Sequence, residues 1–182
     1  LILNNLNQLV KVDRVIFNYI DTENKKNNYT INKAKKNDYI INGSSFNANT
    51  LISNLLKNDE KKENDFFKNN IRINLNLNKV YIDRVNFVNN LKGNLRIKNN
   101  KVYDGEILAF FDKTQNIQFT IKTTEEGEKI TTLFSSKSKP LVDRYKFIKG
   151  FKDGKEGYLD FYSSKKGEVS TSKLVIDNFK VK

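Results

Sequence analysis

The sequence predicts a mainly β fold: an extended antiparallel meander that forms a twisted, groove-like sheet with two short helices. Residues 71–78 alternate apolar and polar side chains without a miss, reading Ile-Arg-Ile-Asn-Leu-Asn-Leu-Asn. Successive side chains of a strand point to opposite faces of a sheet, so this segment has one aliphatic and one polar face. The alternation recurs at residues 107–111, 117–121 and 174–176. A chain that repeats this pattern builds a sheet with one apolar face.

The first part of the chain begins with strands. Apolar residues favour alternate positions in residues 9–19, and residues 29–31 and 38–43 form two further short runs. Polar stretches rich in Asn and Lys separate these runs, which is typical of turns between antiparallel strands.

A helix and a polar loop are predicted next. Apolar residues take helical spacing in residues 51–56, with Asn47 or Asn49 available as the N-cap. Residues 58–65 contain no apolar side chain and are expected to be an exposed loop. The loop divides a single β-rich segment, residues 1–182, into possible sub-units at residues 1–57 and 66–182.

The remainder of the chain is nearly all strand. Strands are predicted at residues 71–77, 80–82, 85–87, 91–97, 102–112, 117–122, 130–134, 158–162 and 171–181. Residues 140–148 interrupt them with a short helix entered at Pro140, since proline is tolerated in the first turn of a helix.

The composition argues against catalysis. The chain has no Cys, His, Met or Trp. The absence of Cys excludes thiolate metal sites, disulfides and Cys nucleophiles, and the absence of His removes the commonest metal ligand and general base. We therefore expect a protein that is not an enzyme and that uses no metal and no cofactor.

The remaining polar motifs do not restore a catalytic site. The carboxylates at Asp104, Asp112, Asp143 and Asp160 lie in no Asp-x-Asp loop or Glu-rich cluster. The pair Ser135-Ser136 has no His to activate it and lies in no nucleophile elbow. We interpret these residues as structural.

The net charge of +12 raises the question of nucleic acid. The five arginines, Arg14, Arg72, Arg84, Arg96 and Arg144, are a small share of the 33 basic residues. Phosphate and base recognition favour Arg over Lys, and most Phe residues fall on the aliphatic face rather than on an exposed stacking platform. We interpret the lysines mainly as a solvated surface, and nucleic acid is an unlikely partner.

The order of parts resembles the AsmA-like C-terminal region, a family of large envelope proteins of Gram-negative bacteria. In that family a strand leads through a serine-containing turn into a short helix with paired apolar residues, and a glycine-rich corner then opens a hairpin that ends in a polar–Phe–polar–Val motif. The matching segments here are residues 130–136, 140–145, 150–157, 158–161 and 174–181, with a strand–Gly–helix unit at 43–56.

This resemblance implies a function in lipid transport. It implies a groove, apolar inside, that carries phospholipid between the inner and outer membranes in the periplasm. It also implies neighbouring segments of the same chain and an N-terminal membrane anchor outside this segment. Its partners are expected to be phospholipid, those neighbouring segments and, through the anchor, the membrane.

The apolar strand faces supply the candidate lipid contacts. The same residues suit the closed core of a structural or adhesive β-module without a ligand, and both interpretations stay open. The candidate groove residues are Ile71, Ile73, Leu75, Leu77, Ile82, Val85, Phe87, Leu95, Ile97, Ile107, Ala109, Phe111, Ile117, Phe119 and Ile121.

Overall fold

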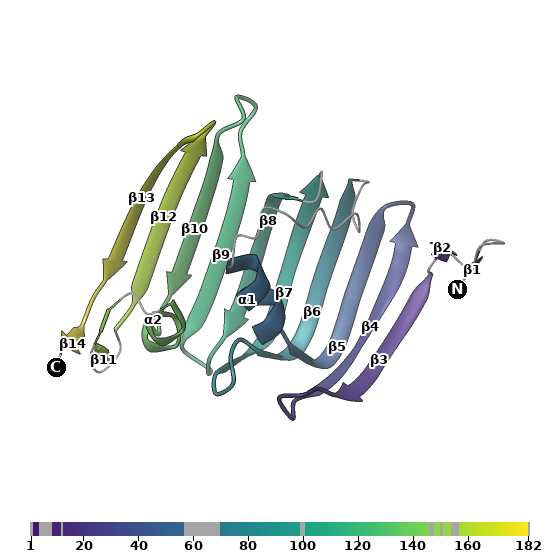
Figure 1. Cartoon of the computed structure of the whole chain (residues 1–182), viewed down its shortest axis with the longest axis horizontal. Helices are drawn as coiled ribbons and strands as arrows, with labels where there is room; N and C mark the ends of the chain where they lie inside the picture. Colours follow the sequence, from purple (N-terminus) through teal and green to yellow (C-terminus); the bar gives the residue numbers. More distant parts are fainter. Residues whose placement is uncertain are drawn as a thin grey trace.

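A computed structural model describes residues 2–3, 9–11, 13–56, 70–98, 101–145, 148–149, 151–153 and 157–181. Its main feature is an open, twisted sheet of ten strands (Figure 1). From one edge to the other the strands are β13 (Val169–Ile176), β12 (Leu159–Lys166), β10 (Lys129–Ser135), β9 (Asn116–Thr123), β8 (Lys101–Phe110), β7 (Phe87–Lys98), β6 (Ile71–Tyr81), β5 (Asp38–Asn47), β4 (Lys26–Lys35) and β3 (Arg14–Ile20).

Four short strands and two helices complete the described part of the chain. Two separate two-stranded sheets pair β1 (Ile2–Leu3) with β2 (Leu9–Lys11) and β11 (Phe151–Asp153) with β14 (Phe179–Val181). The helices are α1 (Asn49–Leu56) and α2 (Lys139–Tyr145). Both lie on the same face of the ten-stranded sheet, α1 in front of β7 and β8 and α2 near the lower ends of β10 and β12 in Figure 1.

The predicted fold class is confirmed, with one difference in topology. Every neighbouring pair in the ten-stranded sheet is antiparallel except β5 and β6, which are parallel. A parallel pair needs a crossover, and the crossover segment between these two strands contains α1. The two sub-units considered from the sequence therefore contribute adjacent strands to one sheet. The predicted loop 58–65 lies outside the described residues.

Both predicted helices are present. The first begins at Asn49, one of the two N-cap candidates, and its first helical hydrogen bond runs from the Ile52 N–H to the Ala48 carbonyl at 2.9 Å. The Asn47 side chain accepts a bond from the Asn49 N–H at 3.1 Å, which satisfies one backbone donor at this helix start. The second helix has Pro140 buried in its first turn, as the sequence predicts.

A bulge in β7 changes which side chains face the helices. The pairing of β7 with β8 shifts between Asn89 and Lys92, and Asn90, inside this stretch, has a positive φ of 51°. Such a bulge puts two residues opposite one and reverses the alternation beyond it. As a result Val88, rather than Phe87, is buried with the core beneath α1.

Glycines allow neighbouring side chains to lie across the central strands. A Cβ at Gly93 would lie 2.6 Å from the Glu106 carbonyl oxygen and 3.0 Å from Cγ1 of Ile107. A Cβ at Gly105 would lie 2.7 Å from Cδ2 of Leu95. Backbone and side-chain atoms of the adjacent strand already occupy both places, so glycine is the residue that fits there.

Candidate functional site

One row of side chains crosses all ten strands of the sheet on the face that carries the helices. Residues paired directly across neighbouring strands project from the same face, so the register identifies the row. We call it the apolar row, and it consists of Val15, Ile31, Ile41, Leu75, Gly93, Ile107, Phe119, Leu133, Phe161 and Leu174.

The apolar row is only partly removed from solvent. Nine of its residues are half-buried, and Leu174 on the edge strand is 40% exposed. Within the described residues, the other sheets have two strands each, and the two short helices lie in front of β7 and β8 and near the lower ends of β10 and β12 (Figure 1). No second large sheet of this part of the chain therefore packs on the row as it would in a sandwich.

The next row towards the helices is closed. Leu77 and Ala109 are 4% and 1% exposed and pack with Val88 and Ala48 beneath α1. Leu159 is 1% exposed and packs with Leu141 and Val142 of α2 and with Phe151. We call these two clusters the covered core, consisting of Ala48, Leu77, Val80, Ile82, Val88, Ala109, Leu141, Val142, Phe151 and Leu159.

The structure places most of the predicted groove residues on this helix-bearing face. Three of them, Leu75, Ile107 and Phe119, belong to the apolar row, and Leu77 and Ala109 belong to the covered core. The others on this face flank the row through their strand positions. Ile73, Leu95 and Ile117 are half-buried, whereas Ile71, Ile97 and Ile121 are buried, at 9%, 9% and 7% exposed.

The remaining four predicted groove residues lie at strand ends or in connections, outside the regular alternation of the strands. Ile82 is part of the covered core, and Phe111 packs against it. Val85 is 82% exposed in the connection between β6 and β7. The Phe87 ring packs edge-on against the Tyr81 ring, with 6.1 Å between the ring centroids. The Lys79 ammonium lies 3.9 Å from the centroid of the Phe87 ring. The bulge at Asn90 explains why the structure does not bring Phe87 onto the apolar face.

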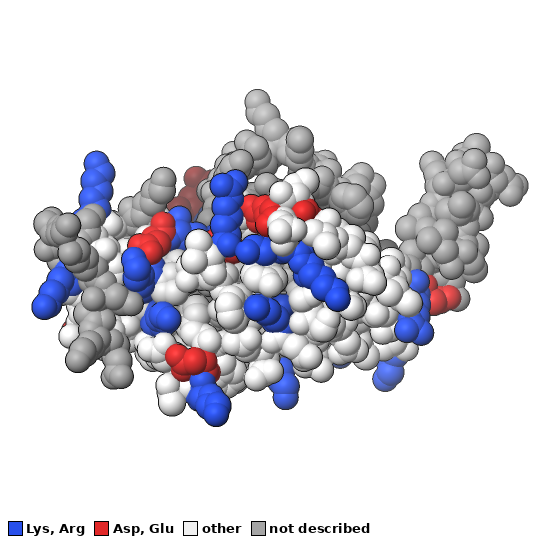
Figure 2. All heavy atoms as spheres, turned by 90° about the horizontal axis from the view of Figure 1, so that it is seen from below, with Lys and Arg blue, Asp and Glu red and all other residues white. Residues whose placement is uncertain are grey.

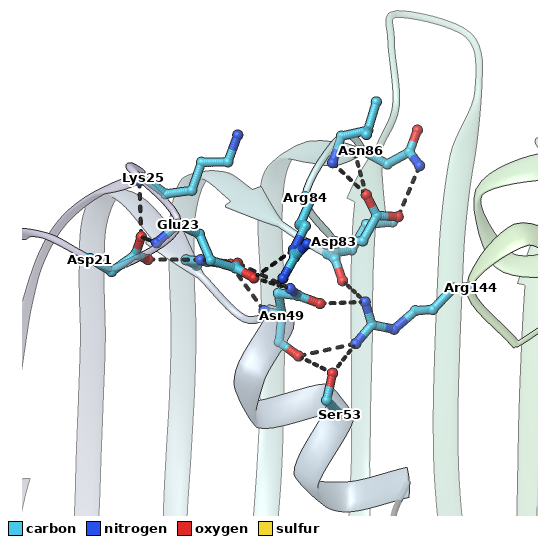
Figure 3. Close-up of polar contacts among 12 residues, drawn as sticks. Asp21, Glu23, Lys25, Asn49, Ser53, Asp83, Arg84, Asn86 and Arg144 are labelled. Atoms are coloured by element: carbon cyan, nitrogen blue, oxygen red, sulfur yellow. Dashed lines mark hydrogen bonds and ion pairs between the residues drawn. The ribbon is translucent and has the colours of Figure 1, made fainter.

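A polar network joins α2 to α1 at the lower end of the sheet (Figure 3). The Arg144 guanidinium donates to the Asn49 side-chain oxygen at 2.7 Å, to the Asn49 carbonyl at 3.0 Å and to the Ser53 hydroxyl at 3.1 Å. It also donates to the Ile82 carbonyl. One side chain thus connects both helices and the end of β6.

Two carboxylates in the connection between β3 and β4 extend this network. Asp21 accepts a bond from the Asn47 amide at 2.7 Å, and Glu23 accepts from the Asn49 amide at 2.8 Å. Asn27 is 1% exposed, and its side-chain oxygen accepts from the Asn47 N–H at 2.8 Å. Because backbone N–H groups donate to the side-chain oxygens of Asn27 and Asn47, the amide nitrogens of both side chains point towards the acids. We assign the cluster a structural role.

These hydrogen bonds shift the pKa values of both acids. Burial acts to raise the pKa of Asp21, but bonds from the Lys25 backbone and the Asn47 amide outweigh it, so that pKa is lowered. The Asn47 and Asn49 amides lower the pKa of Glu23. Both groups are therefore ionised at neutral pH, as the network requires.

A pocket opens between the two helices and the connection from β6 to β7. Its volume is about 1040 Å³, and its lining includes Ser53 of α1, Arg84 and Asn86 of the connection, Lys137 and Arg144. The sequence did not single out this pocket. Its residues come from three distant segments, and none of them forms a motif.

Charges on the rest of the surface are mixed. Figure 2 shows Lys and Arg side chains at the lower end of the molecule separated by uncharged residues and by Asp and Glu. On the polar face of the sheet, Arg72 lies 4.0 Å from Asp38 and Arg96 lies 3.4 Å from Asp104. These ion pairs lie across neighbouring strands and are half-exposed, so each contributes little to stability.

The chain matches no family model, and no curated protein and no solved structure is significantly similar to it. Among the described residues, none of the helices is long and apolar enough to cross a bilayer.

Proposed function

We propose that the apolar row binds the acyl chains of phospholipids, and that the chain is an AsmA-like segment that passes lipid between the inner and outer membranes. One observation carries the proposal: the row runs without a charged or polar residue through all ten strands, and most of it is half-buried. The periplasmic location and the anchor in the inner membrane rest on the family resemblance.

The length of the row suits this ligand. Strands in a sheet lie about 4.8 Å apart, so ten strands span about 40 Å. One leaflet of a bilayer is about 15 Å of hydrocarbon, so the row accommodates acyl chains placed end to end. Burial of each methylene contributes about 0.8 kcal/mol without directional preference, which allows a chain to slide.

The continuity of the row at both edges supports a role for neighbouring segments. Val15 lies on edge strand β3 and Leu174 on edge strand β13, so the apolar face does not end before the sheet does. A further strand paired to either edge would continue the same face. A closed module without a ligand, by contrast, needs a cover for the row.

The test is lipid co-purification, measured by native mass spectrometry and organic extraction of the protein isolated from bacteria. We expect phospholipid in a defined ratio with the wild type. Leu75→Asp and Phe119→Asp should lose it, because a carboxylate on the row is unfavourable beside an acyl chain.

Matched controls lie one residue away on the opposite face. Asn76→Asp and Gln118→Asp change exposed polar side chains of the same strands and should retain the lipid. Circular dichroism and thermal unfolding establish that all four variants fold. Folded Leu75→Asp and Phe119→Asp proteins that keep their lipid, or a wild type free of lipid, would favour the closed structural or adhesive module.

A further inference from the structure

We propose that the pocket between α1, α2 and the β6–β7 connection binds a phosphoryl group, either of a lipid head group or of a free phosphate ester. The site is separate from the apolar row and stands whether or not the row binds acyl chains. Its lining holds four basic side chains and two acidic ones. The charged lining residues are Asp83, Arg84, Lys137, Lys139, Asp143 and Arg144.

Both acids are already engaged. The Asp83 carboxylate accepts bonds from the Val85 N–H at 2.7 Å and from the Asn86 N–H at 2.6 Å, so it is held by its own loop. Asp143 forms an ion pair with Lys139 at 2.7 Å. The oxygens of Asp83 are thus held by its own loop and those of Asp143 by Lys139, and the charged lining residues together carry a net charge of +2.

Two of the cations, Arg84 and Lys137, retain donors that can bind an anion. Arg84 donates through Nε to Glu23 at 3.3 Å, and among the described residues its two terminal nitrogens make no hydrogen bond. Lys137 forms no ion pair within 4.0 Å in this part of the chain, and its ammonium lies 5.9 Å from the Phe111 ring centroid. The ammonium has three donors, and the guanidinium fork matches the oxygens of a phosphate.

The interior of the pocket adds fixed positive charge. The Arg144 guanidinium is bonded to neutral oxygens of Asn49, Ser53 and Ile82 rather than to a carboxylate. Its Nε is buried and, among the described residues, has no hydrogen-bond partner. Arg144 therefore contributes a charge held in place, while Arg84 and Lys137 come from two separate loops on the rim.

The pocket has room for an ester. Its volume of about 1040 Å³ leaves space beside the phosphoryl group, and the pocket is bounded by the helices that lie on the face bearing the apolar row. A phosphomonoester or phosphodiester places its charged oxygens at the cations and leaves room for the group attached to them.

The experiment is an NMR titration of the folded chain with sodium phosphate, against sodium chloride at equal ionic strength, because salt alone screens exposed charges. We expect saturable shifts of backbone amides in residues 84–86 and 136–139. The double variant R84Q/K137Q should weaken phosphate binding about tenfold, which corresponds to about 1.4 kcal/mol.

The matched control is Lys113→Gln. Lys113 is exposed in the connection between β8 and β9 and does not line the pocket. It should leave phosphate affinity unchanged. Shifts that do not saturate, or an equal loss of affinity in K113Q and R84Q/K137Q, would overturn the site. Equal unfolding midpoints of all proteins show that the double variant is folded.

Two further probes identify the source of the phosphoryl group. Tighter binding of dihexanoylphosphatidylglycerol than of glycerol phosphate, with shifts of Leu75 and Leu133 methyl signals, supports a lipid head group. Equal affinity of the two probes supports a free phosphate ester. Pocket shifts without any shift of the row's methyl signals would contradict acyl binding while leaving the phosphoryl site intact.

Discussion

The same alternating pattern runs through two parts of one sheet face, and the helices cover only one of these parts. Leu77 is 4% exposed beneath α1, whereas Leu75, two residues earlier on the same face of β6, is half-buried in the apolar row. The two have the same side chain and project from the same face of one strand. What differs is the layer above them, so tertiary cover decides which leucine is closed in the core and which stays partly open to solvent.

The largest expected effect separates these two leucines. Leu77→Ala removes side-chain volume from a closed core and should lower the free energy of unfolding by about 3 kcal/mol. Leu75→Ala should lower it by about 1 kcal/mol, because its side chain already contacts solvent. Urea unfolding of both variants measures the difference. Equal losses would mean that the row is as closed as the core.

The second prediction concerns the attachment of α2 to α1. Arg144→Met removes a charged donor from four oxygens and should lower the free energy of unfolding by about 2 kcal/mol. Hydrogen exchange of α2 should accelerate, since this attachment is local.

Arg144→Lys serves as the control for charge. It keeps the positive charge but lacks the planar fork, so it should recover only a minor part of the loss. Full recovery by Lys would show that charge, rather than the set of hydrogen bonds, holds the two helices together.

The smallest expected effect is a loss of folding stability at acidic pH. Folding lowers the pKa values of Asp21 and Glu23 below their ordinary values of 3.8 and 4.5. The stability they contribute is therefore fully present above those ordinary values, and it is lost as the pH falls through the lower folded values.

Urea unfolding between pH 6 and pH 2 measures this loss. Asp21→Asn combined with Glu23→Gln should reduce the fall in stability over that range, whereas Glu125→Gln in an exposed turn should leave it unchanged. A variant that follows the wild-type pH profile would show that the two acids do not contribute through their ionised forms.

The alternating segments could be predicted from the sequence because their signal is local. The pattern at residues 71–77 correctly identified the apolar side of β6, and the change of spacing at residues 51–56 identified α1. The parallel pairing of β5 with β6 was not predicted. It depends on where the chain returns after α1, which no local period encodes.

The sequence did not predict two other features, and particular residues show the physical reason. The bulge at Asn90 reverses the face of Phe87, and an Asn in a chain rich in Asn gives no warning of a positive φ. Arg144 reaches Asn49 across 95 positions of sequence. The polar network and the pocket beside it therefore emerge only when distant loops meet at one end of the sheet.

The most direct test of acyl-chain binding measures intermolecular NOEs between the acyl-chain protons of bound phospholipid and the methyl groups of the protein, because an NOE requires direct contact. We predict NOEs to Ile41, Leu75, Ile107 and Leu133 of the apolar row. Val88, Val142 and Leu159 of the covered core should show none, nor should Ile16, which is 61% exposed on the opposite face. NOEs of equal strength to all these methyl groups, or none to the row, would contradict acyl-chain binding there.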